Sequence, residues 1–341
     1  MNYVFCGAYK ALLFALYIKN LGEEITIVTY SKDVTKYCAN ENIKCISFPF
    51  LKLSIKSIYK LFTLKKTLDE VIEKMNVGKE DNYFLTGKVL AYESIYIAKE
   101  LAKKGNKIYY KNVMRELNIF KPSGLKSIFI KGMIFKFFMK FALDLDIMYY
   151  ESNEDPRLGF DEETLKKYNI IDYKPDKKTE EMILEAVKNT KSSCKGADNL
   201  IIDQGPIENL VELNSIKRIY ERIFNLHIDF ALKKHPLPAE ENDEITISYY
   251  NIFKHCKELE SYVPVELFCN NIKKNAISLF SASLITASQF EHLKAISLLE
   301  LINWKHNSYK QEFKNRLIEE SNNKILFPAS FEELKEILLN S

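Results

Sequence analysis

The sequence has little of what marks several common classes of protein. Lysine plus arginine exceed aspartate plus glutamate by only 49 to 46 in 341 residues, so it lacks the strongly basic field that drives binding to nucleic acid. The six cysteines are scattered, and the closest pair, Cys38 and Cys45, has neither zinc-ligand nor disulfide spacing. We therefore expect free thiols, a reducing cytoplasm and no nucleic-acid partner.

Long apolar runs are also missing. The first residues, MNYVFCGAYK, begin directly on a strand-like run, so we expect no signal peptide. The nearest approach to a membrane span is residues 126–143, where lysines interrupt the apolar residues every four or five positions. Helical spacing places Lys126, Lys136 and Lys140 on one side. Two interpretations stay open: a helix that lies on an anionic membrane, or one that covers a core while its lysine stems extend to water.

Glycine is scarce, with 10 residues in the chain. Gly7 stands alone after the first expected strand, so the GxGxxG fingerprint of dinucleotide binding is absent. A P-loop, an HExxH motif, a GxSxG nucleophile elbow and a kinase signature are absent too. These absences exclude the most easily recognised nucleotide-binding, metalloprotease and hydrolase families.

The first ~110 residues alternate short β-rich runs with helical segments, a pattern typical of a parallel sheet wrapped by helices. Strands are predicted at 2–6, 25–30, 45–48, 82–87 and 106–111. Helices are predicted at 9–22 and 88–105, and end in Gly22 and Gly105, which suit the left-handed position after a helix.

Residues 150–195 are polar and suit an interdomain linker with short helices, so we place a domain boundary near 190. Two domains follow, 1–190 and 191–341. The second has predicted strands at 199–203, 228–234, 245–250, 276–280 and 295–301, with helices at about 207–225 and 263–273. A last helix is predicted in SFEELKEILLN, with Ser330 as its N-cap and Glu333 completing a capping box. We expect this helix to pack back on the first domain. The predicted fold class is α/β with two Rossmann-like domains.

Polar side chains follow three predicted strands of the second domain. They lie in DQGPIE at 203–208, KKHPLP at 233–238 and FSAS at 280–283, and Glu266 lies near the start of the helix before the last of these strands. Because ligands of open parallel sheets bind at the carboxyl ends of strands, we expect these segments to face one crevice. Lys233 and Lys234 are expected to end their strand in solvent.

These segments resemble the bacterial sialyltransferases of glycosyltransferase family 52, which include the lipooligosaccharide sialyltransferases. KKHPLP is similar to their His-Pro motif, and YVPVELFCNNIKKNAISLFSASLIT to their Glu-bearing helix and serine-containing strand end. NYVFCGAYKALLFALYI is similar to the family's opening strand and helix, and NLIIDQGPIENL to the loop with its catalytic carboxylate. The four segments occur in the family's order.

The resemblance implies a GT-B fold, in which two Rossmann-like domains with parallel sheets face a central cleft. It implies transfer of sialic acid from CMP-sialic acid, with inversion, to a cell-surface glycan acceptor such as lipooligosaccharide or capsule. No cofactor or metal is required by this chemistry. A homodimer is implied as well. From the free thiols and the lysine-rich segment at 126–143 we expect a location in the cytoplasm, or peripherally at the inner face of the cytoplasmic membrane.

An inverting transfer needs a base for the acceptor hydroxyl and donors for the leaving phosphate. His235 suits the phosphate, since its charge is available near neutral pH, and Pro236 makes its loop rigid. Ser281 and Ser283, with the amides around Ala282, suit a phosphate cradle that also caps the next helix.

Glu266 is expected to bind the ribose hydroxyls or the cytosine amino group, or to be an exposed helix residue. Glu208 and Asp203 both match the loop of the catalytic carboxylate, and Glu208 is preferred because it lies beyond Pro206, where a helix start would aim it at the cleft. Asp203 would otherwise be a turn residue, and Glu208 a first-turn acid.

One departure from the family stands out. Its acidic pair followed by glycine is missing, and IYYKNVMRE occupies the corresponding place, with Asn112 and Glu116 as the polar residues that remain. Either the acceptor is bound differently, or one of two alternatives holds. These are a GT-B transferase that uses another nucleotide-sugar such as a UDP-hexose, and a non-catalytic protein that binds nucleotides or glycans.

Overall fold

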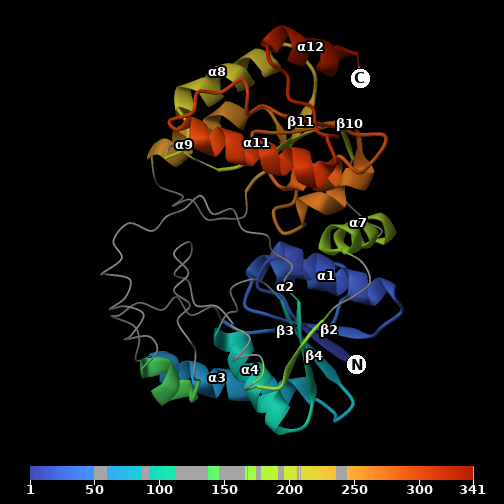
Figure 1. Ribbon diagram of the computed structural model, residues 1–341, viewed down its shortest axis with the longest axis vertical. Helices are drawn as coiled ribbons and strands as arrows, with labels where there is room; N and C mark the ends of the chain where they lie inside the picture. Colours follow the sequence, from blue (N-terminus) through green and yellow to red (C-terminus); the bar gives the residue numbers. More distant parts are fainter. Residues whose placement is uncertain are drawn as a thin grey trace. The chain divides into compact units, whose positions relative to one another are not determined.

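The computed structural model describes residues 1–49, 60–86, 92–111, 137–145, 166, 168–173, 178–190, 196–205, 207, 209–235 and 244–340 (Figure 1). The chain divides into two compact units, Met1–Ala186 (unit 1) and Val187–Ser341 (unit 2). The division lies four residues before the boundary expected from the sequence (186 against 190). Each unit is an α/β domain with a parallel sheet, which confirms the predicted fold class.

Unit 1 contains a six-stranded sheet in the order β3-β2-β1-β4-β5-β6, and each neighbouring pair is parallel. Five of its strands are the ones predicted. The sixth, β6, lies inside the polar segment interpreted as a linker and instead extends the sheet beside β5. The strands are β1 (Asn2–Phe5), β2 (Ile25–Thr29), β3 (Cys45–Ser47), β4 (Asn82–Thr86), β5 (Lys107–Lys111) and β6 (Ile170–Asp172).

Helices cover both faces of this sheet. Alternation along β4 sends Phe84 toward Phe14 of α1, with ring centroids 5.9 Å apart, whereas Tyr83 and Leu85 join the core formed with α3 and α4. Gly22 and Gly105 have φ angles of 86° and 87°, as predicted for residues that end helices. The helices are α1 (Tyr9–Asn20), α2 (Lys32–Asn40), α3 (Lys60–Met75), α4 (Tyr92–Lys103), helical residues 137–143, and α7 (Thr179–Asn189), which spans the division between the units.

Unit 2 contains a five-stranded sheet in the order β11-β10-β7-β8-β9, also parallel throughout. Its strands are β7 (Ala197–Ile202), β8 (Phe230–Lys233), β9 (Lys257–Glu258), β10 (Ile272–Ser278) and β11 (Lys294–Ser297). Its helices are α8 (Leu213–Phe224), α9 (Glu244–Tyr250), α10 (Ser283–Ala287), α11 (Asn307–Ser321) and α12 (Phe331–Leu339), with 3₁₀ segments η2 (Asn251–Phe253) and η3 (Val265–Asn271).

Three element predictions in unit 2 need correction. ITISYY is not a strand: it lies within helix α9. The helix expected at 263–273 is the 3₁₀ segment η3, and β10 already begins at Ile272. The helix expected from about 207 begins at Leu213. By contrast, Ser330 does cap α12, since its hydroxyl accepts the N–H of Glu333 at 3.2 Å.

Polar side chains, most of them buried, join two neighbouring inner strands of each sheet. In unit 2, Asn275 of β10 donates to Asn199 of β7 at 2.7 Å, and the hydroxyl of Ser278 donates to the carbonyl of Ile202 at 2.7 Å. Unit 1 repeats the arrangement between β4 and β1. There, Asn82 donates to Asn2 at 2.9 Å and Thr86 donates to the carbonyl of Phe5 at 2.6 Å.

Among the described residues, no helix has both the length and the apolar character needed to cross a bilayer. The described cysteines are all free thiols, as predicted.

Replacing Asn275 by alanine should destabilise unit 2 by about 2 kcal/mol, because Asn275 is fully buried and its loss leaves the side-chain oxygen of Asn199 without this donor. The measurement is urea denaturation followed by fluorescence of Trp304, the single tryptophan of the chain, which lies in unit 2. Lys273→Ala, at a 74% exposed side chain of the same strand, is the matched control. A cost for Asn275→Ala no larger than that of the control would contradict the structural role of the pair.

Candidate functional site

The strand orders locate one crevice in each unit. In unit 2 the chain runs from β7 outward through β8 to β9, then crosses to β10 on the other side of β7. In unit 1 the same reversal occurs between β1 and β4. Ligands of open α/β sheets bind outside the carboxyl ends of the strands at such reversals. The candidate residues are therefore those that follow β7, β8 and β10 in unit 2, and those that follow β1 and β4 in unit 1.

Asp203 follows β7 directly and is 2% exposed. One carboxylate oxygen accepts the N–H of Gly205 at 2.8 Å and the hydroxyl of Tyr249 at 2.6 Å. The other accepts the backbone N–H of His235 at 3.1 Å and the hydroxyl of Tyr250 at 2.9 Å. Asp203 thus joins the loops after β7 and β8 to helix α9. Burial raises the pKa of both tyrosines, and Asp203 raises it further, so they stay protonated donors.

His235 lies just after β8, with its side chain partly buried. Burial lowers the pKa of His235 below 6.5; Asp203 opposes this shift, and Lys233 adds to it. The neutral imidazole is consequently favoured near neutral pH in the free protein. The sequence-based expectation of an available charge holds only if a bound anion raises this pKa again.

Lys233 does not end its strand in solvent. It is 3% exposed, and its ammonium donates to the carbonyl of Ser261 at 2.8 Å. The expectation was therefore wrong for Lys233, since the loop after β9 folds over the lysine and supplies an acceptor. Lys234 is partly exposed and pairs with Glu258 at 2.7 Å.

The serine segment follows β10 and meets Glu266. Glu266 of η3 is buried, and the hydroxyl of Ser283 donates to its Oε1 at 2.8 Å. Ser283 is the first residue of α10, with Ala282 as the N-cap, and the hydroxyl of Ser281 accepts the N–H of Ser283 at 3.3 Å. The Ser281 hydroxyl thus satisfies the first N–H of α10, while the hydroxyl of Ser283 is used by Glu266.

The backbone donors of this segment are largely used within it. The N–H groups of Leu284 and Ile285 bond to the carbonyls of Ser281 and Ala282, each at 3.1 Å. Because the hydroxyl of Ser283 donates its proton to Glu266, a phosphate at this place would rely on the hydroxyl of Ser281 more than on the start of the five-residue helix α10.

The structure thus brings together two groups of predicted residues at neighbouring strand ends, Asp203 with His235 and Glu266 with Ser281–Ser283. β7 and β10 are joined next to both groups by the bond from Ser278 to Ile202. Glu208, Pro236, Asn112 and Glu116 lie outside the described residues. Within the described residues, no cluster of three or more histidine, cysteine, aspartate or glutamate side chains is placed to hold a metal ion.

Glu93, which the sequence analysis passed over, lies in the first turn of α4, shortly after β4. It is 1% exposed, and burial raises its pKa from 4.5 to about 7. It accepts a hydrogen bond from the side chain of Tyr92, whereas its Oε1 is buried without a partner among the described residues. The hydroxyl of Tyr83 is likewise buried without a hydrogen-bond partner among the described residues. Glu93 precedes Ile97 and Leu101 by four and eight residues, so its place on the apolar stripe was a signal available from sequence.

Gly7, which follows β1 at the same reversal of strand order, is packed against Tyr30. A Cβ at Gly7 would approach the hydroxyl of Tyr30 to 2.8 Å. Burial raises the pKa of Tyr30 to about 12, and Glu93 adds to the shift. The edge of the unit 1 sheet at which the strands end therefore carries tyrosines near one titratable side chain, that of Glu93.

No protein-family model matches the sequence, and no curated protein matches it. Several solved structures resemble the chain. A putative UDP-N-acetylglucosamine 2-epimerase from Listeria monocytogenes has 14% identity and a TM-score of 0.48, over 95% of this chain and 89% of that chain. S. aureus MnaA in complex with UDP has 13% identity and a TM-score of 0.43, over 99% and 96%. A glycosyltransferase from Rickettsia africae has 13% identity and a TM-score of 0.39, over 100% and 99%. The resemblance to the family 52 sialyltransferases stays a prediction from the motifs.

Proposed function

We propose that the protein is an inverting glycosyltransferase of the GT-B type, with CMP-sialic acid as the donor and a cell-surface glycan as the acceptor. One observation carries the proposal. Asp203, His235 and the serine segment follow β7, β8 and β10 of one parallel sheet, beside the reversal of strand order in unit 2. This is where a nucleotide is expected in such a sheet.

His235 is proposed to donate to the leaving phosphate. Because its pKa is lowered in the free protein, the imidazole binds as a neutral donor or takes up a proton when the phosphate arrives. Negative charge grows on the phosphate as the glycosidic bond breaks, so a donor fixed at this place stabilises the transition state more than the ground state.

Asp203 is proposed to position His235 rather than to act as the base. Its two oxygens already accept four hydrogen bonds from groups of the protein, and a base must approach the acceptor hydroxyl directly or through one water. Glu208 remains the proposed base. Glu266 is proposed to orient Ser283 beside the nucleotide.

Glu93 is a second candidate for proton transfer, on the side of unit 1. Tyr92 is partly exposed and hydrogen-bonded to Glu93, so a proton can pass between the surface and the buried carboxyl group through the tyrosine hydroxyl. A carboxyl group with a pKa near 7 exchanges protons readily at neutral pH.

Two alternative functions stay open. The donor is another nucleotide-sugar such as a UDP-hexose, or the protein binds a nucleotide or glycan without turnover, as the missing acidic triplet would allow. Homodimer formation, a cytoplasmic location and catalysis without a metal are further predictions.

Calorimetric titration with CMP and, in parallel, UDP tests the nucleotide. We expect CMP to bind more tightly, and His235→Ala to weaken binding by about tenfold or more, since a hydrogen bond to a charged group contributes about 1.5–3 kcal/mol. Ser281→Ala should weaken binding less than His235→Ala does, because it removes a single hydroxyl group. His255→Ala is the matched control, because His255 is exposed and lies in the same unit.

Each outcome of this titration has a distinct meaning. Tighter binding of UDP would support the first alternative, in which the donor is another nucleotide-sugar such as a UDP-hexose. CMP binding without transfer to any glycan would favour the second. Binding of neither nucleotide would contradict the proposed function.

The stability of unit 1 should fall as pH rises from about 5 to about 8. Glu93 has a raised pKa, so between pH 4.5 and 7 the folded state binds more protons than the unfolded state, and its stability decreases with pH. Glu93→Gln should remove this dependence and stabilise unit 1 on the order of 3 kcal/mol at pH about 8, with little change at pH about 4.5. Urea denaturation followed by far-ultraviolet circular dichroism measures it.

Trp304 fluorescence, which reports unit 2, serves as the internal control and should be unaffected by Glu93→Gln. Glu70→Gln, at an exposed site on α3, should leave the pH dependence of the wild type in place. If Glu93→Gln and wild type show the same pH dependence, Glu93 is not the titrating group.

A further inference from the structure

Three phenylalanines form an exposed aromatic patch on unit 1. Phe62 of α3 is 49% exposed, and Phe137 and Phe141 of helical residues 137–143 are 65% and 70% exposed. The rings of Phe137 and Phe141 stack with centroids 6.2 Å apart, and Phe141 meets Phe62 edge-on at 5.9 Å. We call Phe62, Phe137 and Phe141 the aromatic patch. Exposed apolar side chains that gather in this way indicate a binding surface.

The patch is not the core-facing side of its helix. Met139, Ala142 and Leu143 of the same segment are buried and belong to the core of unit 1. They already cover the apolar surface formed by α3 and α4, so Phe137 and Phe141 are left on the outward side. Covering a core therefore explains one face of this segment and leaves the other unexplained.

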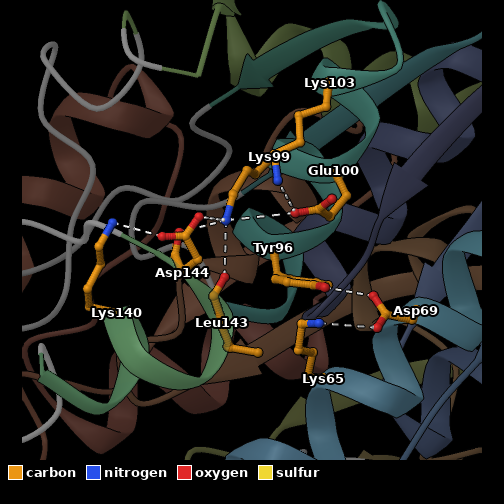
Figure 2. A network of polar contacts seen from close by, with 9 residues as sticks. All are labelled: Lys65, Asp69, Tyr96, Lys99, Glu100, Lys103, Lys140, Leu143 and Asp144. Carbon is orange, nitrogen blue, oxygen red and sulfur yellow. Dashed lines mark hydrogen bonds and ion pairs between the residues drawn. The ribbon is translucent and has the colours of Figure 1, made fainter.

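A buried lysine fixes the segment in this orientation (Figure 2). The ammonium of Lys99, on α4, donates to the carbonyl of Leu143 at 3.2 Å, to the carbonyl of Asp144 at 2.6 Å and to the carboxylate of Asp144 at 2.9 Å. Lys140 pairs with the same carboxylate at 2.8 Å. Salt-bridged lysines lower the pKa of Asp144 well below its usual range. The patch is thus presented by a segment anchored at its end.

Positive charge accompanies the patch in the sequence. Residues 42–68 and 117–143, which provide its three phenylalanines, contain no aspartate or glutamate, although the chain as a whole is nearly balanced at 49 to 46. The lysines of these stretches are Lys44, Lys52, Lys56, Lys60, Lys65 and Lys66, and Lys121, Lys126, Lys131, Lys136 and Lys140.

The described lysines nearest in sequence to the patch are exposed. Lys65 and Lys140 have side chains 49% and 53% exposed, and their acidic partners, Asp69 and Asp144, follow just beyond the two acid-free stretches. Lys60 and Lys66, on the first half of α3, are exposed as well. Aromatic rings beside lysines fit a surface that is apolar within and anionic at its face, which is the chemistry of an anionic bilayer.

We propose that the aromatic patch, with the lysines of α3 and residues 137–143, docks this protein on an anionic lipid bilayer. The rings enter the boundary between headgroups and acyl chains, and the lysines pair with lipid phosphates. This proposal is independent of the donor nucleotide, since it concerns a surface of unit 1 alone.

Sedimentation of the full chain with lipid vesicles tests it. Vesicles of phosphatidylcholine with roughly 30 mol% phosphatidylglycerol should bind the wild type, vesicles of phosphatidylcholine alone should not, and raising salt from about 0.1 to about 0.5 M should weaken binding severalfold. Phe62→Ala/Phe137→Ala/Phe141→Ala should reduce partitioning by about tenfold or more. Lys60→Gln/Lys66→Gln should reduce it by a smaller factor and make it less sensitive to salt.

The matched control replaces three exposed apolar residues that are not part of the patch, Leu21→Ala/Ile247→Ala/Leu339→Ala, which are 51%, 49% and 50% exposed in the wild type. It should bind anionic vesicles like the wild type. Far-ultraviolet circular dichroism verifies that each variant is folded, and CMP affinity, measured in the absence of vesicles, should be unchanged by the patch substitutions.

Three results would overturn the proposal: equal binding of the wild type to both kinds of vesicle, wild-type binding by the phenylalanine variant, or no binding to anionic vesicles. If the last result came with a dimer that the phenylalanine substitutions dissociate, the patch would be an interface between two copies of the chain.

Discussion

The architecture of both units depends on buried and part-buried hydrogen bonds between two neighbouring inner strands of each sheet. In each unit the strand that follows the crossover ends in a hydroxyl residue, Thr86 or Ser278. That hydroxyl donates to the carbonyl of the last residue of the first strand, Phe5 or Ile202. An asparagine pair adds a second side-chain bond between the same two strands in each unit. Slipping either strand by one residue would leave these polar groups buried and unpaired, so the register is strongly specified. The strand ends that carry the candidate residues are fixed as a consequence.

Two buried carboxyl groups near these strand ends differ in how their charge is compensated. Asp203 accepts four hydrogen bonds, two on each oxygen. Such a group is held in one orientation and holds its neighbours in turn, which suits the positioning of the backbone that carries His235. Glu93 accepts from Tyr92, and its Oε1 lacks a partner among the described residues. Because desolvation is poorly compensated there, its pKa rises to about 7. The first arrangement provides geometry, and the second provides a group able to exchange a proton.

Much of the local structure was predictable from sequence, because it rests on local chemistry. The strands of unit 1 up to β5, the helix-ending glycines and the Ser330 cap all follow from periodicity and backbone preferences. ITISYY was not predictable in this way, since β-branched and aromatic residues favour a strand. In a strand, neighbouring side chains point to opposite faces, so Tyr249 and Tyr250 could not both reach Asp203, whereas adjacent helical positions can. Bonds to a residue more than 40 positions away therefore favour the helix over the strand. The burial of Glu93 is non-local for the same reason.

Helix α4 shows how buried charges of opposite sign can serve different purposes within one element. Lys99 is nearly fully buried, and the carbonyl and carboxylate oxygens around its ammonium compensate its desolvation, so it anchors residues 143–144. Glu93 lies six residues earlier on the helix, about 9 Å along the axis, at the carboxyl edge of the sheet. A buried charge with all its partners holds the local structure in one arrangement, whereas a half-paired one costs stability. α4 retains both kinds, and the destabilising one lies at the reversal of strand order, where a ligand is expected. This placement is the physical reason to regard Glu93, and not Lys99, as a candidate for chemistry.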